Sequence, residues 1–180
     1  LAKSARRHRR KPSDLGDCIV AFDIDQVHVE ATRRAVENTL NEEGIGNGAA
    51  KSLAERWVRQ DDFLLALLDS GSFDAVVGNP PYIRIEHLAP EVQAVYRQRF
   101  ESLYDRADIY VAFIERALDL LAKDGTLSFI CADRWTLNRY GAPLRRIITD
   151  SYRVKAYIDL HGASPFESEV IAYPSIFAIT

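Results

Sequence analysis

Short apolar runs alternate along the chain with longer segments that have helical spacing. The runs are rich in β-branched and aromatic residues, which favour strands, and they lie at residues 18–23, 55–60, 73–79 and 126–132. Apolar residues that recur every three or four positions predict helices at 26–42, at 108–123 and near 140–150. Two more strands are expected near 154–159 and 170–180.

This order of elements predicts the fold class. Strands that alternate with helices and are apolar throughout indicate a parallel sheet covered on both faces, so we expect an α/β protein with a doubly wound, mostly parallel sheet. The last two strands have no helix between them, which indicates an antiparallel hairpin at one edge. The length of 180 residues suits a single domain.

Composition agrees with a folded domain and narrows its setting. The chain is 47% hydrophobic and 27% charged, which excludes the disordered class. It has no apolar run as long as a membrane span and no signal peptide, so a cytoplasmic protein is expected. Cys18 and Cys131 lie in apolar runs, which favours two buried, reduced thiols. The four histidines have no zinc spacing, so no metal site is expected.

The N-terminal segment 1–17 is basic, with six Lys or Arg among its first eleven residues. It fits either the solvated end of a helix or an arm that faces nucleic acid. Because the sequence contains no methionine, Leu1 is not expected to be a translation start, and the chain is expected to be a piece of a longer protein.

Acidic residues follow two of the predicted strands, at the sheet edge where doubly wound proteins bind ligands. Asp23 ends the first run, and a carboxylate there can accept both hydroxyl hydrogens of a ribose, whereas Asp25 suits the N-cap of the next helix better. Asp62 and Phe63 follow the second run and could hold an adenine. Asp61 and Asp62 could equally be turn residues, and the residues alone favour the turn.

The tetrapeptide Asn79-Pro80-Pro81-Tyr82 follows the third strand and carries a more specific signal. Asn79 offers a side-chain carbonyl, and Pro80 offers a main-chain carbonyl whose direction is held by Pro81. Two fixed acceptors beside the flat ring of Tyr82 suit a planar group that bears an NH2. Acceptors that hydrogen-bond to both hydrogens of the NH2 group favour its pyramidal geometry, which restores the nitrogen lone pair. The paired prolines are therefore explained as a means to preorganise these two acceptors. A rigid strand exit is the alternative, but it explains neither the Asn nor the Tyr.

Together these stretches resemble the NPPY-type S-adenosylmethionine-dependent DNA adenine-N6 methyltransferases, especially those of type II restriction–modification systems, including fused methylase–endonuclease chains. The resemblance runs from Cys18 to Thr180 and rests on the order of AFDID, DDFL, GNPPY, DIYVAFIERALDLLAKDGTLSFICADRW and ASPFESEVIAYPSIFAI. It implies a class I methyltransferase fold, S-adenosylmethionine as the cofactor, and double-stranded DNA with a flipped adenine as the partner.

The resemblance also implies roles for individual residues. Asp23 would hold the cofactor ribose and Ile24 would pack on the cofactor adenine, which Asp62 and Phe63 would also contact. The catalytic residues would be Asn79, Pro80, Pro81 and Tyr82, and the target base would stack between Tyr82 and Phe166.

The departures from the family pattern matter as well. The family's first motif, a Gly-rich loop after the first strand, has no counterpart, because the Gly-rich residues 44–48 follow a helix. The chain is therefore expected to be a single, partial catalytic domain over residues 1–180, with a basic segment at 1–17 and a core at 18–180. It would lack the first strand and the Gly-rich loop, and would be inactive alone.

Two other functions stay open from the sequence. The same tetrapeptide occurs in methyltransferases that modify a glutamine side chain of proteins, and a non-catalytic interaction module derived from this fold is the other alternative. The net charge of −3 argues against strong DNA binding by this piece. Four arginines could line a DNA cleft or simply solubilise the surface: Arg134, Arg139, Arg145 and Arg146.

Overall fold

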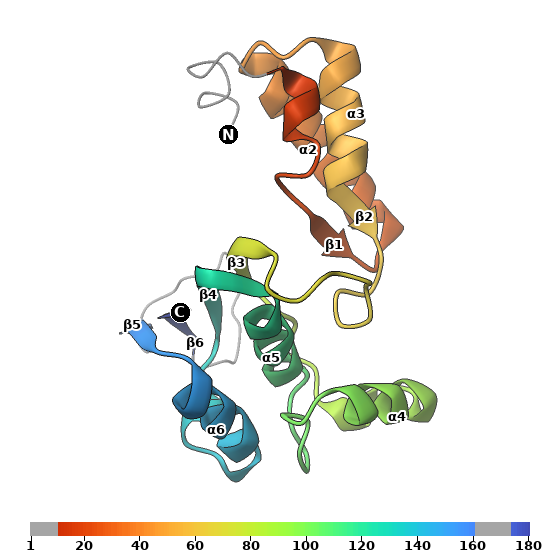
Figure 1. Ribbon diagram of the computed structural model, residues 1–180. Helices are drawn as coiled ribbons and strands as arrows, with labels where there is room; N and C mark the ends of the chain where they lie inside the picture. The colour runs from red at the N-terminus through yellow and green to blue at the C-terminus, as the bar shows by residue number, and fades with distance from the viewer. Residues whose placement is uncertain (1–10, 161–173) are drawn as a thin grey trace. The chain divides into compact units, whose positions relative to one another are not determined.

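The computed structural model describes residues 11–160 and 174–180. The chain divides into two compact units, Leu1–Ala66 and Leu67–Thr180, and each has its own arrangement of strands and helices (Figure 1).

The first unit pairs two short strands with two helices. After the 3-10 turn η1 (Pro12–Leu15), the elements are β1 (Ala21–Asp23), α2 (Gln26–Glu42), α3 (Asn47–Trp57) and β2 (Val58–Gln60). Strands β1 and β2 are parallel, with Asp23 opposite Gln60, and α2 and α3 lie side by side (Figure 1). The bounds of α2 confirm the predicted helix 26–42. The Gly-rich residues 44–48 follow α2 and run into the first turn of α3, so they follow a helix as expected.

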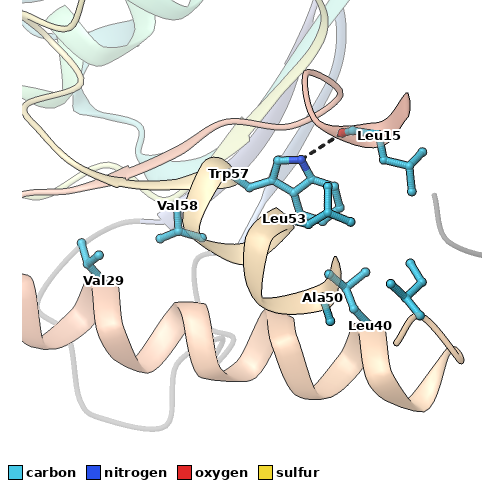
Figure 2. Close-up of a cluster of buried hydrophobic side chains, with 8 residues drawn as sticks. Leu15, Val29, Leu40, Ala50, Leu53, Trp57 and Val58 are labelled. Carbon is cyan, nitrogen blue, oxygen red and sulfur yellow. Dashed lines mark hydrogen bonds between the residues drawn. The ribbon is translucent and has the colours of Figure 1, made fainter. Parts of the chain in front are cut away.

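A small hydrophobic core holds this unit together (Figure 2). It gathers side chains from η1, α2, the connection between α2 and α3, α3 and β2, namely Leu15, Val29, Leu40, Ile45, Ala50, Leu53, Trp57 and Val58. The indole Nε1 of Trp57 donates a hydrogen bond of 3.0 Å to the carbonyl oxygen of Leu15, which satisfies the buried N–H. Each large side chain buried in this way contributes about 1.5–3 kcal/mol, so the core fixes the helices on which β1 and β2 rest.

The second unit is built on a four-stranded sheet with the order β3-β4-β6-β5. Its strands are β3 (Phe73–Gly78), β4 (Leu121–Ala132), β5 (Val154–Asp159) and β6 (Pro174–Ile179). The helices are α4 (Pro90–Arg99), α5 (Tyr110–Leu120) and α6 (Ala142–Ser151), with 3-10 turns η2 (Ile85–His87), η3 (Arg134–Thr136) and η4 (Arg139–Gly141). Strand β3 is parallel to β4, and β6 is antiparallel to both β4 and β5. Three of the four strands therefore share one direction, which confirms the mostly parallel sheet with a terminal antiparallel hairpin.

Several boundaries differ from the prediction. The first strand begins at Ala21 rather than at residue 18. Cys18 is therefore exposed, whereas Cys131 is buried, so the expectation of two buried thiols is wrong for Cys18 and confirmed for Cys131. The strand predicted at 55–60 starts only at Val58, because Ala50, Leu53, Ala54 and Trp57 form the buried face of α3. Helices α3 and α4 were not predicted. Helix α5 ends at Leu120 rather than 123, and Asp124, at φ 64°, lies within β4.

Burial follows the position of each strand in the sheet. The expectation of strands covered on both faces holds for the central strands, in which Leu127 of β4 and Phe177 of β6 are almost fully buried. It is wrong for β3 and β5, whose side chains are mostly exposed, and Val77 of β3 is 75% exposed. Each of these two strands has only one neighbour in the four-stranded sheet, so its outer backbone edge is unpaired in that sheet.

Within residues 11–160 and 174–180, no helix is long and apolar enough to cross a membrane. Over the same ranges, no group of three or more His, Cys, Asp or Glu side chains is placed to hold a metal ion.

Candidate functional site

The tetrapeptide Asn79-Pro80-Pro81-Tyr82 leaves the carboxyl end of β3, where the sequence places it. Gly78 ends the strand against the ring of Phe129 on β4, and a Cβ at that position would come within 3.1 Å of this ring. Glycine therefore lets the strand end lie close to its neighbour. Asn79 and Pro81 are exposed, Pro80 is buried and Tyr82 is half-buried, so the peptide presents polar groups from an anchored backbone.

The side chains at the two ends of the tetrapeptide contact each other. The Tyr82 hydroxyl donates a hydrogen bond of 3.3 Å to Asn79 Oδ1, which fixes the oxygen side of the amide. A carbonyl oxygen has two lone pairs, so Oδ1 can still accept one more hydrogen. Burial, with a smaller effect from Cys131, raises the pKa of Tyr82 to about 12, so the hydroxyl remains a donor at neutral pH. Within residues 11–160 and 174–180, no backbone donor hydrogen-bonds to the Pro80 carbonyl.

Backbone pairing clamps the chain that follows Tyr82. The N–H of Ile109 donates to the carbonyl of Ile83 at 2.8 Å, and the N–H of Ile85 donates to the carbonyl of Ala107 at 3.0 Å. The same register places Arg84 opposite Asp108 in an antiparallel bridge. The tetrapeptide is thus held by β3 on one side and by the residues that lead into α5 on the other.

Three residues that were not predicted as site residues, Asp108, Tyr110 and Tyr140, form a chain of contacts that begins at the Tyr82 ring. The rings of Tyr82 and Tyr110 meet edge to face, with centroids 6.2 Å apart and planes at 85°. The hydroxyl oxygens of Tyr110 and Tyr140 lie 2.7 Å apart, and Tyr140 donates to Asp108 Oδ2 at 3.4 Å. Tyr110 lies within the helix predicted at 108–123, and no spacing signal in the sequence links it to Tyr82.

The candidate cofactor residues gather at the carboxyl ends of β1 and β2 in the first unit. The N–H of Asp61 donates to the carbonyl of Asp23 at 3.1 Å, so the segment after β2 starts beside the end of β1. Asp23 Oδ1 accepts the N–H of Asp25 at 2.8 Å, and Oδ2 lies 3.5 Å from Nδ1 of His28. Ile24 is 74% exposed despite its apolar side chain. The Asp25 carboxylate accepts the N–H of Val27 at 2.8 Å, which confirms it as the N-cap of α2.

Asp62 and Phe63 lie in a turn after β2. Asp62 Oδ1 accepts the N–H of Leu64 at 2.9 Å, and its carbonyl accepts the N–H of Ala66 at 2.7 Å, which confirms the turn favoured from the residues alone. The ring of Phe63 packs at a tilt against Phe22 of β1, with centroids 6.1 Å apart. Contact of either residue with a cofactor adenine stays a prediction.

The structure therefore brings the predicted residues together in two groups, one in each unit. Phe166 and residues 1–10 of the basic segment lie outside the described residues. Arg145 donates to the carbonyls of Trp135 and Asn138, at 2.6 and 2.9 Å, and Arg146 forms an ion pair with Glu101. These two arginines therefore have structural contacts, which weakens the prediction that they line a DNA cleft. Arg134 and Arg139 are exposed.

Comparisons with known proteins identify relatives of this chain. The Type II methyltransferase M.PaeR7I of Pseudomonas aeruginosa is 47% identical over 99% of this chain and 31% of its own length. The Type II methyltransferase M.BstVI of Geobacillus stearothermophilus is 43% identical over 99% of this chain and 33% of its own. The chain thus spans about a third of the length of these curated relatives.

A solved structure from Listeria monocytogenes, described as a class I S-adenosylmethionine-dependent methyltransferase, superimposes with a TM-score of 0.56. It is 18% identical, and the match covers 88% of this chain and 42% of that one, which shows the class I fold. Residues 17–166 match the Eco57I restriction-modification methylase family, a match that includes both groups of candidate site residues. The chain belongs to the Eco57I restriction-modification methylase family.

Proposed function

We propose that this chain is part of a restriction–modification enzyme that transfers a methyl group from S-adenosylmethionine to the N6 amine of adenine in double-stranded DNA. The observation that carries the proposal is the tetrapeptide at the end of β3. It offers Asn79 Oδ1 and the Pro80 carbonyl as acceptors, beside the half-buried ring of Tyr82, within a chain of this family.

The residues at the ends of β1 and β2 fit S-adenosylmethionine. A carboxylate offers about four acceptor positions, and the contacts of Asp23 with the Asp25 N–H and His28 leave room for ribose hydroxyls. Ile24, 74% exposed, offers apolar surface for an adenine ring. Asp62 and Phe63 complete the proposed adenine contacts from the neighbouring turn. When bound, the cofactor supplies an electrophilic methyl group on a sulfonium sulfur.

The protein's own contribution is to make the adenine amine nucleophilic. The amine lone pair is delocalised into the base, so acceptors that hold both N–H groups favour the pyramidal geometry that frees this lone pair. The amine nitrogen would then bond to the methyl carbon as the sulfur leaves as a thioether, and the nitrogen would lose one proton. Asn79 Oδ1 would accept one hydrogen on its remaining lone pair, and the Pro80 carbonyl would accept the other. Because Pro81 and the hydrogen bond from Tyr82 hold these acceptors in place, little reorganisation is needed as charge develops.

The target adenine would reach these acceptors by flipping out of the duplex, as base-modifying enzymes require. The Tyr82 ring would stack on the flipped base, and Phe166 would contact its other face.

We further propose that both units belong to one catalytic domain over residues 1–180, with a basic segment at 1–17 and a core at 18–180. The family match from 17 to 166 includes residues of both units, which supports this. We also propose that the protein is cytoplasmic, because its proposed DNA substrate would be there.

Residues 1–180 alone are expected to be inactive. The Gly-rich residues 44–48 follow α2 and not a strand, so they do not form the loop that wraps the methionine end of the cofactor in the family pattern.

The direct test is a methylation assay of the full-length protein with radiolabelled S-adenosylmethionine. One arm offers duplex DNA of random sequence, and a matched arm offers duplexes in which N6-methyladenine replaces adenine. A third arm offers proteins that are methylated on glutamine in cells. Nucleoside mass spectrometry should find newly labelled N6-methyladenine in the first arm alone. Label in the protein arm would instead support a glutamine methyltransferase, and no label in any arm would support a non-catalytic module.

A further inference from the structure

We propose that Tyr110 is a positioning residue, which holds the Tyr82 ring in the orientation needed to receive a flipped base. The inference rests on the proposed function of Tyr82 and adds a residue from a different element, the first turn of α5. It is carried by three contacts: the ring pair, the hydroxyl pair with Tyr140, and the backbone clamp between residues 83–85 and 107–109.

The ring contact constrains the side chain of Tyr82 directly. Its partner Tyr110 is fully buried, with an exposed fraction of 0%, and the two rings meet at 85°. An edge-to-face pair depends on the tilt of both rings, because rotation of either ring separates the edge from the face. Half-buried Tyr82 therefore rests against a partner that is enclosed by protein.

The hydroxyl contacts keep Tyr110 itself in place. Since Tyr140 donates its hydrogen to Asp108 Oδ2, the hydrogen between the two tyrosine oxygens comes from Tyr110, which sets one direction along the chain Tyr110–Tyr140–Asp108. Burial raises the pKa of both Tyr110 and Tyr140, so both hydroxyls stay protonated and the chain persists at neutral pH.

The backbone clamp links the two rings by a second, independent path. Asp108 lies opposite Arg84 in the bridge, and Ile109 bonds to Ile83, so the residues adjoining Tyr110 are paired with the residues that follow Tyr82. A ring held by its backbone and by its neighbour's ring can keep a fixed pose before any base arrives. Preorganisation of this kind lowers the cost of reaching the productive geometry.

The test places one fluorine atom, as 3-fluorotyrosine, at position 82 of the full-length protein. Fluorine NMR then reports the environment of that ring whether or not the protein turns over. Tyr110→Leu should shift and broaden the signal, whereas Tyr110→Phe, which keeps the ring, should restore it. Tyr152→Phe is the matched control, because the Tyr152 hydroxyl also bonds to α5, at the carbonyl of Leu118, and should leave the signal unchanged.

The same variants without fluorine are then assayed for methylation. Tyr110→Leu should lower kcat by about 2- to 10-fold, the range expected for the loss of an edge-to-face pair. Its dissociation constant for S-adenosylmethionine should be unchanged, and Tyr110→Phe should recover most of the turnover. If Tyr110→Leu does not fold, Tyr140→Phe replaces it, because it removes the hydrogen bond to Asp108 that orders the hydroxyl chain and should broaden the fluorine signal to a smaller extent.

An unmoved fluorine signal in the Leu variant would overturn the proposal, and so would a moved signal with unchanged kcat. A wild-type protein that methylates no adenine would instead refute the proposed function. The fluorine experiment would still decide whether Tyr110 fixes Tyr82.

Discussion

The Tyr82 hydroxyl donates a hydrogen bond to Asn79 Oδ1 across 3.3 Å, so the first and last residues of the tetrapeptide hold each other. The bond determines which end of the Asn79 amide is presented as the oxygen. It also gives Tyr82 two roles in the proposed site, since the ring face would stack on a base while the hydroxyl orients an acceptor.

Asn79→Ala in the full-length enzyme removes one of the two proposed acceptors. Because these acceptors matter most as the amine becomes pyramidal, kcat should fall by about 100- to 1000-fold, by analogy with the loss of one preorganised donor. Cofactor affinity should stay near the wild-type value. Single-turnover kinetics and calorimetry would measure the two quantities, and Asn138→Ala, at another exposed Asn of the second unit, is the control. A collapse of cofactor affinity with turnover intact would show that Asn79 has a different role.

Asp23→Ala tests the proposed ribose contact in the first unit. Hydrogen bonds to a charged group contribute about 1.5–3 kcal/mol, so affinity for S-adenosylmethionine should fall by roughly 10- to 150-fold. Asp25→Ala is the matched control, because it removes the N-cap of α2 at a cost of about 1 kcal/mol in stability and should leave affinity unchanged. Calorimetry on the full-length protein would measure both. Equal affinities for Asp23→Ala and wild type would remove Asp23 from the cofactor site.

Much of the fold could be predicted because its signals are local. Asp25, the apolar spacing after it and the glycines near 44–48 mark both ends of α2, and its bounds match the prediction. Helix α3 was missed because Gly46 and Gly48 suggest a loop, while Trp57 and Val58 suggest a strand, although Ala50, Leu53, Ala54 and Trp57 have helical spacing. Helix α4 was missed because Glu, Gln and Arg side chains interrupt its apolar positions, so that only Tyr96 is buried.

The residues of the candidate site also divide into those that a local sequence signal predicts and those that it does not. Asn79 and Tyr82 are three residues apart, so the sequence alone places them together, and the same holds for Asp23 and Ile24. Tyr110 reaches Tyr82 only because β3, the clamp and α5 fold together, and so large a separation along the chain carries no local signal. The place of β3 at the edge of the four-stranded sheet likewise depends on pairing between distant segments, which its apolar sequence does not reveal.

Asp108 should titrate above the ordinary value of an aspartate. Burial raises its pKa most, and Arg84, the hydrogen bond from Tyr140, Arg134 and His87 oppose that rise. The native state therefore binds the proton more tightly than the unfolded chain does, so Asp108 lowers stability as pH rises from 3.8 through its native pKa. NMR of ¹³C-labelled aspartate would give the pKa, and Arg84→Ala should raise it further. A pKa at or below 3.8 would contradict the burial of this carboxyl.

The two cysteines should react with alkylating reagents at very different rates. Cys18 is exposed, whereas Cys131 is buried in β4, and burial raises the pKa of its thiol. Because the thiolate is the reactive form, iodoacetamide at about pH 8 should label Cys18 readily and Cys131 only after denaturation. Peptide mass spectrometry of the native protein would measure both, with a guanidinium-treated sample as the control. Rapid native labelling of Cys131 would mean that β4 opens readily.

Substitutions at Tyr82 separate the ring from the hydroxyl. Tyr82→Phe keeps the π-face but removes the bond to Asn79, which contributes about 0.5–1.5 kcal/mol, so kcat should fall only a few-fold. Tyr82→Ala also removes the stacking platform, at a further cost of about 1–3 kcal/mol. Steady-state methylation by the full-length enzyme would give both rates, and Tyr104→Ala, at an exposed tyrosine of the same unit, is the control.

A duplex with 2-aminopurine at the target position makes the stacking itself visible. Its fluorescence should rise when the base leaves the duplex, and the Tyr82 ring should partly quench it by stacking. The signal should therefore be brighter with Tyr82→Ala than with the wild type or Tyr82→Phe, although all three flip the base. If Tyr82→Phe is as inactive as Tyr82→Ala while its fluorescence stays quenched, the hydroxyl that orients Asn79 is the working group. The base would then still stack on the ring, and the proposal that stacking sustains turnover would have to be abandoned.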